Sequence, residues 1–234
     1  KSRSRGLGDV YKRQVMTTAT PKAAKLMQTE RYAVGGVIPA GAVYLFVNDR
    51  SIDTVEEMSG KKIATLDYDA PSIKMVNHVG AAVVPSNSAN FSGKFNNGSV
   101  DIAYAPAIAY KPLEMYKGLG ENGAILRYNL AYLDFQLVFH REQFNDEYTQ
   151  KSREFVAGLF DRAIKSIKQH TDEIEDHYWL DLPEAQQKEY NEMLRQVRIT
   201  LRDEGVYDGK MLRLLKNLRC KADGSAAECV ENLE

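Results

Sequence analysis

Aromatic, amide and acidic side chains cluster at the ends of predicted strands between Ser51 and Lys117. Asp67-Tyr68-Asp69 follows the apolar run 63–66, and Tyr104 closes the next predicted strand, 100–104. Ligands bind beyond the carboxyl ends of the strands in sheets of this kind, where rings can stack on a small polar solute and amides can hydrogen-bond to it. The candidate solute-binding residues are Asp67, Tyr68, Asp69, Asn87, Asn90, Phe91, Tyr104 and Tyr110.

The two carboxylates of this set allow a second interpretation. Asp67 and Asp69 are close enough in sequence to act as an acid–base pair in catalysis. Asp69 also precedes Pro71, which suits the first turn of a helix, so we favour Asp69 as a helix cap. The sequence has no G-x-S-x-G, phosphate-binding or dinucleotide-binding motif. We therefore expect no enzyme and no cofactor, with an enzyme on this fold as a minor alternative.

A third group of residues has the spacing of metal ligands. His170, Glu173 and His177 are three and four residues apart in a segment that we predict to be helical, so they can share one face. The neighbouring segment is rich in glutamate, which favours a solvent-exposed face. We expect no metal site here.

The elements that position the candidate site form an α/β pattern. The segment 51–117 is predicted to contain a strand at 63–66, a helix from Pro71 to Gly80, a polar loop, a strand at 100–104 and a helix at 107–117. Residues 31–47 are β-rich but broken by Gly35-Gly36 and by Pro39-Ala40-Gly41, which reads as two strands joined by a turn. A long strand is predicted over 125–139, and everything beyond Asn145 reads as helical, with one helix from Pro183 to Gly205 and another over 210–218.

Several segments resemble a known family. VEEMSGKKI at 55–63, VGA at 79–81 and GSVD at 98–101 resemble motifs of the solute-binding proteins of TRAP-type transporters. FVNDRSI, GKKIA, KFNNGSVDI and APAIAYKPLE together resemble a divergent group of solute-binding proteins. The resemblance covers roughly residues 43–140 well and the C-terminal third only loosely.

The resemblance implies a two-lobed, type II periplasmic-binding-protein fold with a helical C-terminal third. It also implies a periplasmic protein, a monomer at full length, that binds a small polar solute between its lobes and passes it to membrane permease subunits. The alternative is a ligand-sensing module of a receptor or regulator on the same fold. The arginine with which the family clamps a substrate carboxylate is Ala64 here. We therefore expect the solute not to be a simple dicarboxylate.

The N-terminal segment looks foreign to the fold. SRGLGDVYKRQ at 4–14 resembles a translated sequencing adapter, so we expect 1–14 to be non-native, the first lobe to be largely missing and a signal peptide to have been lost with it. We divide the rest into a first-lobe remnant with the crossing strand at 15–47, a second α/β lobe at 48–124, and the return strand with the C-terminal helices at 125–234. Without 1–14, the chain holds 26 basic and 31 acidic residues, a net charge of −5. That balance gives no reason to expect nucleic acid as a partner.

The two cysteines, Cys220 and Cys229, flank a short polar loop. No further cysteine or histidine lies near them, so a zinc site is not expected. Free thiols in a reducing compartment are one interpretation. A disulfide is the other, and we favour it because the family resemblance implies export to an oxidising compartment.

Overall fold

The computed structural model describes residues 3–222, 224, 227–231 and 233, and the chain forms two compact units. One unit comprises residues 1–42 and 131–172, and the other comprises residues 43–130 and 173–234. Lys1 and Ser2 of the segment predicted to be non-native lie outside the described residues. The division into four parts made from the sequence stays a prediction.

The larger unit is built on parallel strands. In chain order its elements are β2 (Lys62–Leu66), α3 (Ala70–His78), β3 (Ala82–Ser86), α4 (Phe91–Asn96), β4 (Ile102–Pro106), α5 (Tyr116–Leu119), β5 (Ala124–Leu126), β7 (Trp179–Leu180), α8 (Glu184–Asp203), α9 (Gly209–Ala222) and α10 (Ala227–Val230). Short 3₁₀ helices lie at Glu56–Met58, Ala107–Ala109 and Asp176–Tyr178. The α/β class predicted from the sequence is confirmed.

The order of the strands places several strand ends at one edge of the sheet. The sheet runs β3-β2-β4-β1-β5-β7, where β1 spans Tyr32–Val47. β2 is parallel to both β3 and β4, and β5 is parallel to β7. β1 is antiparallel to β4 and to β5, so β5 runs in the same direction as β4. The carboxyl ends of β2, β3, β4, β5 and β7 therefore share one edge.

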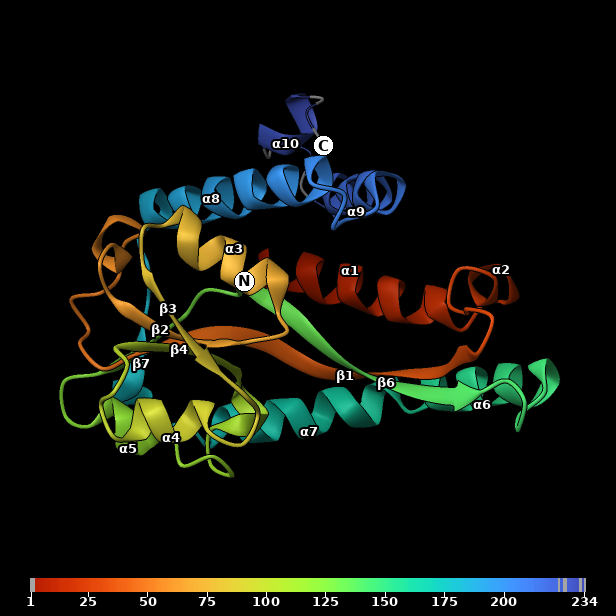
Figure 1. Ribbon diagram of the computed structural model, residues 1–234, viewed down its shortest axis with the longest axis horizontal. Helices are drawn as coiled ribbons and strands as arrows, with labels where there is room; N and C mark the ends of the chain where they lie inside the picture. The colour runs from red at the N-terminus through yellow and green to blue at the C-terminus, as the bar shows by residue number, and fades with distance from the viewer. Residues whose placement is uncertain (1–2, 223, 225–226, 232, 234) are drawn as a thin grey trace. The chain divides into compact units, whose positions relative to one another are not determined.

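Each face of this sheet carries its own core. On one face, α3 and α8 cover a cluster that includes Leu45, Ile63, Ile102 and Tyr190, as Figure 1 shows above the strands. On the other face, α4 and α5 lie over a cluster built on Phe46, Phe95, Tyr110 and Ile125. Alternation along the strands produces the two sets, because successive side chains point to opposite faces.

The smaller unit contains α1 (Arg3–Thr18), α2 (Pro21–Ala24), residues 32–42 of β1, β6 (Ala131–His140), α6 (Asp146–Gly158) and α7 (Phe160–Asp172). β6 pairs with β1. Tyr11 and Val15 of α1 and Phe160 of α7 are buried together, and the Tyr11 hydroxyl donates to the carbonyl of Leu133 and to the carboxylate of Asp134. Tyr11 lies within the segment predicted to be foreign, and the foreign origin of that segment stays a prediction.

β1 corrects the expectation of two strands joined by a turn. It runs unbroken through Gly35-Gly36 and Pro39 for 16 residues. The glycines are needed for close packing, because a Cβ at Gly35 or Gly36 would collide with the side chains of Phe139 or Val156. From the sequence alone, these glycines were interpreted as turn residues. In the structure, they let Phe139 of β6 and Val156 of α6 pack directly against the backbone of β1.

Other element boundaries also differ from the predicted ones. The apolar run 125–139 divides into β5 and β6, because the chain leaves the sheet between Arg127 and Leu130. The predicted polar loop contains β3 and α4, and β7 interrupts the region predicted to be wholly helical. The helix predicted over 107–117 is a 3₁₀ turn followed by the short α5, whereas α3 and α8 start and end close to their predicted bounds.

The disulfide between Cys220 and Cys229 is present, with their Cα atoms 5.6 Å apart. Glu228 lies beside the bridge, and its carboxylate accepts from Arg198 and Arg219 at 2.8–2.9 Å. The bond ties α9 to α10, and Glu228 also joins α10 to α8 through Arg198 and to α9 through Arg219. Among the helices in the described part of the chain, none combines the length and the apolar character that a membrane span requires.

Candidate functional site

The predicted residues that follow β2 and β4 come together at the shared strand edge. Tyr104, in the middle of β4, accepts a hydrogen bond from the Leu66 amide at 3.2 Å and donates one to Asp69 Oδ2 at 3.2 Å. Burial raises the pKa of the Tyr104 hydroxyl, so it is a hydrogen-bond donor at neutral pH. One side chain thus fixes the loop 67–69 against the neighbouring strand.

Asp69 has the capping role that we favoured from the sequence. Its carboxylate accepts from the Ser72 amide at 3.1 Å and from the Ser72 hydroxyl at 2.5 Å, with Pro71 in the first turn of α3. Asp67 instead is exposed, and within the described part of the chain its one hydrogen bond is from its backbone amide to the Ser86 carbonyl at 2.9 Å. The two carboxylates therefore have different surroundings: Asp69 is structural, and Asp67 is accessible to a ligand.

Tyr68 and the two asparagines are also accessible. Tyr68 leaves 71% of its surface exposed between the two acids. Asn87 and Asn90 follow β3 and hydrogen-bond to each other's backbone: the Asn87 amide donates to Asn90 Oδ1 at 2.9 Å, and the Asn90 amide donates to Asn87 Oδ1 at 3.1 Å. Both side-chain amide NH₂ groups remain exposed as donors.

Two of the predicted residues are largely in the core. Phe91 is partly buried and packs against the cluster under α4. Tyr110 is 1% exposed, and its hydroxyl donates to Glu175 at 2.5 Å. Burial, together with the Glu175 carboxylate, raises the pKa of Tyr110, and the same hydrogen bond lowers the pKa of Glu175. Tyr110 is therefore buried and does not offer its ring to a solute as the exposed residues do.

Two cationic groups at this edge were missed by the sequence reasoning. Lys94 on α4 reaches back to β3, where its ammonium group contacts the Pro85 carbonyl and the Ser86 hydroxyl. Arg127 follows β5 directly, and its guanidinium lies over the ring of Trp179 with its Cζ 4.8 Å from the ring centroid. A charged residue after a strand was the signal that singled out Asp67. It was overlooked at Arg127 because the strand was predicted to continue to 139.

The histidines considered as metal ligands do not share a helix. α7 ends at Asp172, and His177 lies in the separate 3₁₀ helix Asp176–Tyr178. His170 Nδ1 is 2.8 Å from the Ser166 carbonyl, and Glu173 pairs with Lys111 at 3.5 Å. Among the residues that the structure describes, the group with metal-ligand proximity is Cys220, Glu228 and Cys229, whose two sulfur atoms are bonded to each other.

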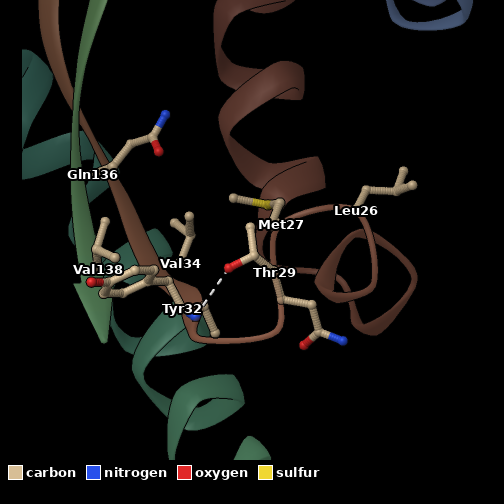
Figure 2. Close-up of a pocket in the computed structure, with 9 residues that line it drawn as sticks. Leu26, Met27, Thr29, Tyr32, Val34, Gln136 and Val138 are labelled. Carbon is tan, nitrogen blue, oxygen red and sulfur yellow. Dashed lines mark hydrogen bonds between the residues drawn. The ribbon is translucent and has the colours of Figure 1, made fainter. Parts of the chain in front are cut away.

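A pocket of about 330 Å³ lies in the smaller unit, and its lining includes none of the predicted site residues (Figure 2). Met27, Val34 and Val138 point towards it, and its polar Thr29 hydroxyl already accepts from the Tyr32 amide at 3.1 Å. Gln28 and Gln136 bring amides to its lining, and none of the described residues that line it is charged. The pocket therefore has few polar groups with which to orient a polar solute.

The family described as solute-binding protein AdeT 1/2 matches residues 9–234. The chain belongs to this family. The Acinetobacter baumannii protein named "Probable solute-binding protein AdeT1" is 42% identical over 92% of this chain and 71% of its own length. A second protein of that organism, "Probable solute-binding protein AdeT2", is 26% identical over 89% of this chain and 88% of its own length.

Solved structures extend the AdeT 1/2 family's likeness to the TRAP-type fold. A TRAP periplasmic solute-binding protein from Desulfovibrio salexigens, solved with orotic acid, has a TM-score of 0.67 at 13% identity, over 91% of this chain and 71% of that one. The ectoine-binding protein of the Halomonas elongata TeaABC TRAP transporter has a TM-score of 0.68 at 16% identity, over 88% and 68%. The predicted type II periplasmic-binding-protein fold is confirmed.

Proposed function

We propose that this protein captures a small polar solute in the periplasm and delivers it to the membrane permease subunits of a TRAP-like transport system. Membership of a solute-binding family and the fold of TRAP periplasmic proteins support capture of a small molecule. The protein performs no chemical step in this proposal and acts as a monomer. Binding alone provides the selectivity.

The observation that carries the proposal is the convergence of polar groups at one strand edge. The Tyr104–Asp69 hydrogen bond holds the loop after β2 beside the end of β4, and the Asp67 amide is bonded to the end of β3. Exposed groups of different chemistry therefore come from neighbouring strands. In the proposed site, Tyr68 stacks on the solute, Asp67 and the amides of Asn87 and Asn90 hydrogen-bond to it, and Asp69, Phe91 and Tyr104 border it.

Tyr110 has a supporting role in this proposal. Its ring is buried in the core under α4 and α5, and its hydroxyl bonds to Glu175. It therefore stabilises the loop that follows β4 and leaves solute contact to the exposed residues.

The proposal is tested by thermal shift with a panel of neutral, anionic and cationic polar solutes. We expect at least one solute to raise the melting temperature of the wild-type chain, and the Tyr68→Ala variant to lose that response. Phe155→Ala is the matched control, because Phe155 on α6 is as exposed, at 69% against 71% for Tyr68. An equal response in both variants would place the solute elsewhere, and no response to any solute would contradict solute capture.

A further inference from the structure

The ends of β5 and β7 bring a cation and an anion together at the proposed solute edge. Leu126 and Leu180 are paired in parallel register, so the residues that follow them, Arg127 and Asp181, are neighbours. Arg127 Nε lies 2.8 Å from Asp181 Oδ1. Because β5 runs in the same direction as β4, this ion pair belongs to the edge at which the proposed site lies.

An aromatic surface supports the guanidinium. Trp179 is partly buried, and its ring lies 4.8 Å from Arg127 Cζ, a cation–π contact. Tyr44 of β1 meets the same indole edge to face, with the ring centroids 5.0 Å apart. Arg127 is two residues beyond Ile125, so the two side chains share a face of the sheet, and Ile125 packs in the same core as Tyr44 and Trp179. The ring contacts restrict the directions that the arginine can take.

The ion pair leaves most of the arginine available. The Arg127 side chain is 51% exposed and the Asp181 side chain is 82% exposed. In the part of the chain that the structure describes, the two terminal nitrogens of this guanidinium make no hydrogen bond. An ion pair this exposed is weak, so an incoming carboxylate can displace Asp181.

We propose that Arg127 is the anion-binding residue of the solute site and that it binds a solute with one carboxylate and an apolar body. The carboxylate takes the terminal nitrogens of Arg127 in a bidentate pair, and the apolar body lies on Trp179 and Tyr44. Asp181 holds the guanidinium in the absence of solute and competes with the ligand. This inference rests on the proposed function.

Three other positions considered for the anion-binding residue are excluded by their side chain, place or contacts. Ala64 stands where the resembling family has an arginine, and it is 2% exposed within the core. Lys62 begins β2, so it lies at the amino end of that strand, on the edge of the sheet opposite the proposed site. Lys94 is at the correct edge, but its ammonium group is engaged by the end of β3.

Trp179 is the only tryptophan in the sequence, so its fluorescence reports on this position alone. The experiment titrates the full chain with butyrate and with butyramide, its neutral counterpart, and follows Trp179 emission. We expect butyrate to change the emission and butyramide to leave it nearly unchanged. Arg127→Gln should weaken butyrate binding about tenfold, since hydrogen bonds to a charged group are lost.

Asp181→Asn distinguishes binding from a structural role of the ion pair. Removal of the competing carboxylate should strengthen butyrate binding about twofold or more. If the ion pair were merely structural, Arg127→Gln and Asp181→Asn would both weaken butyrate binding. Arg213→Gln, an exposed arginine on α9, is the matched control and should bind as the wild type does.

The outcomes separate this inference from the proposed function. Equal butyrate binding by wild type and Arg127→Gln, or weaker binding by Asp181→Asn, would overturn the role of Arg127. If the solute panel described above yields responses to neutral or cationic solutes only, the inference fails and solute capture stands. If no solute of any kind produces a response, both fail.

Discussion

The Tyr104 hydroxyl lies between the Leu66 amide, from which it accepts a hydrogen bond at 3.2 Å, and the Asp69 carboxylate, to which it donates one at 3.2 Å. The first bond is to the last residue of β2, and the second is to the cap of α3. The Tyr104 hydroxyl of β4 is therefore hydrogen-bonded both to the end of β2 and to the start of α3. The proposed solute-binding loop is held by a side chain outside the loop.

Tyr104→Phe removes that hydroxyl while it keeps the ring. We expect the free energy of unfolding to fall by about 1 kcal/mol, because the partly buried Leu66 amide loses its partner. The response to solute should weaken as well, since the loop 67–69 is less restricted. Urea denaturation and thermal shift measure the two effects. Tyr116→Phe is the control, because its hydroxyl makes only a 3.4 Å contact to Glu114 and should change neither.

Asp69 and Asp67 should respond differently to substitution. Asp69→Ala removes a helix cap and should lower the free energy of unfolding by about 0.5–2 kcal/mol. Asp67→Ala should leave stability nearly unchanged, since the Asp67 side chain is exposed and only its amide is bonded. Chemical denaturation of the two variants is the measurement. Equal losses of stability would contradict the separate roles.

The Tyr110–Glu175 hydrogen bond predicts a pH effect. The pKa of Glu175 lies below its ordinary value of 4.5, chiefly because the Tyr110 hydroxyl donates to the carboxylate. A carboxyl with a lowered pKa stabilises the fold above its ordinary pKa, and this contribution is lost as the pH falls through the lowered value.

Tyr110→Phe should therefore raise the pKa of Glu175 towards 4.5 and reduce the loss of stability below that pH. NMR titration of the Glu175 side chain measures the first effect, and melting temperatures between pH 3 and 6 (about the range over which a glutamate titrates) measure the second. An unchanged Glu175 pKa in the variant would contradict this cause.

The disulfide should stabilise the C-terminal part of the larger unit. A bridge closing a loop of this length stabilises by about 2–3 kcal/mol in the chain-entropy account. Cys220→Ser with Cys229→Ser should lower the melting temperature and speed proteolysis of residues beyond α8. Intact mass before and after alkylation without reduction verifies the bond, because both thiols should be protected. The Arg198→Gln variant tests whether the ion pair between Arg198 and Glu228 also contributes to the stability of this C-terminal part.

Local signals in the sequence were sufficient for much of the fold. Asp69 before Pro71 predicts the start of α3, because a cap and a proline in the first turn act within a few residues. The apolar run 63–66 followed by polar residues predicts β2 and places Asp67 at its carboxyl end. The family motifs extended these local signals to the type II fold, and the parallel pairing of β2, β3 and β4 then brought the predicted residues to one edge.

Tertiary structure alone decided which of these residues are free to meet a ligand. Tyr110 is buried because Glu175, far along the chain, supplies the partner for its hydroxyl. Arg127 ends a strand because β5 pairs with β7 and then leaves the sheet, although the apolar pattern of 125–139 continues without a break. Pairing and burial depend on contacts between residues distant in sequence, and a pattern of side chains along one strand does not carry that information. The sequence by itself therefore determined local elements such as β2, α3 and α8, whereas the packing of β5 against β7 decided that a cation stands at the edge of the proposed site.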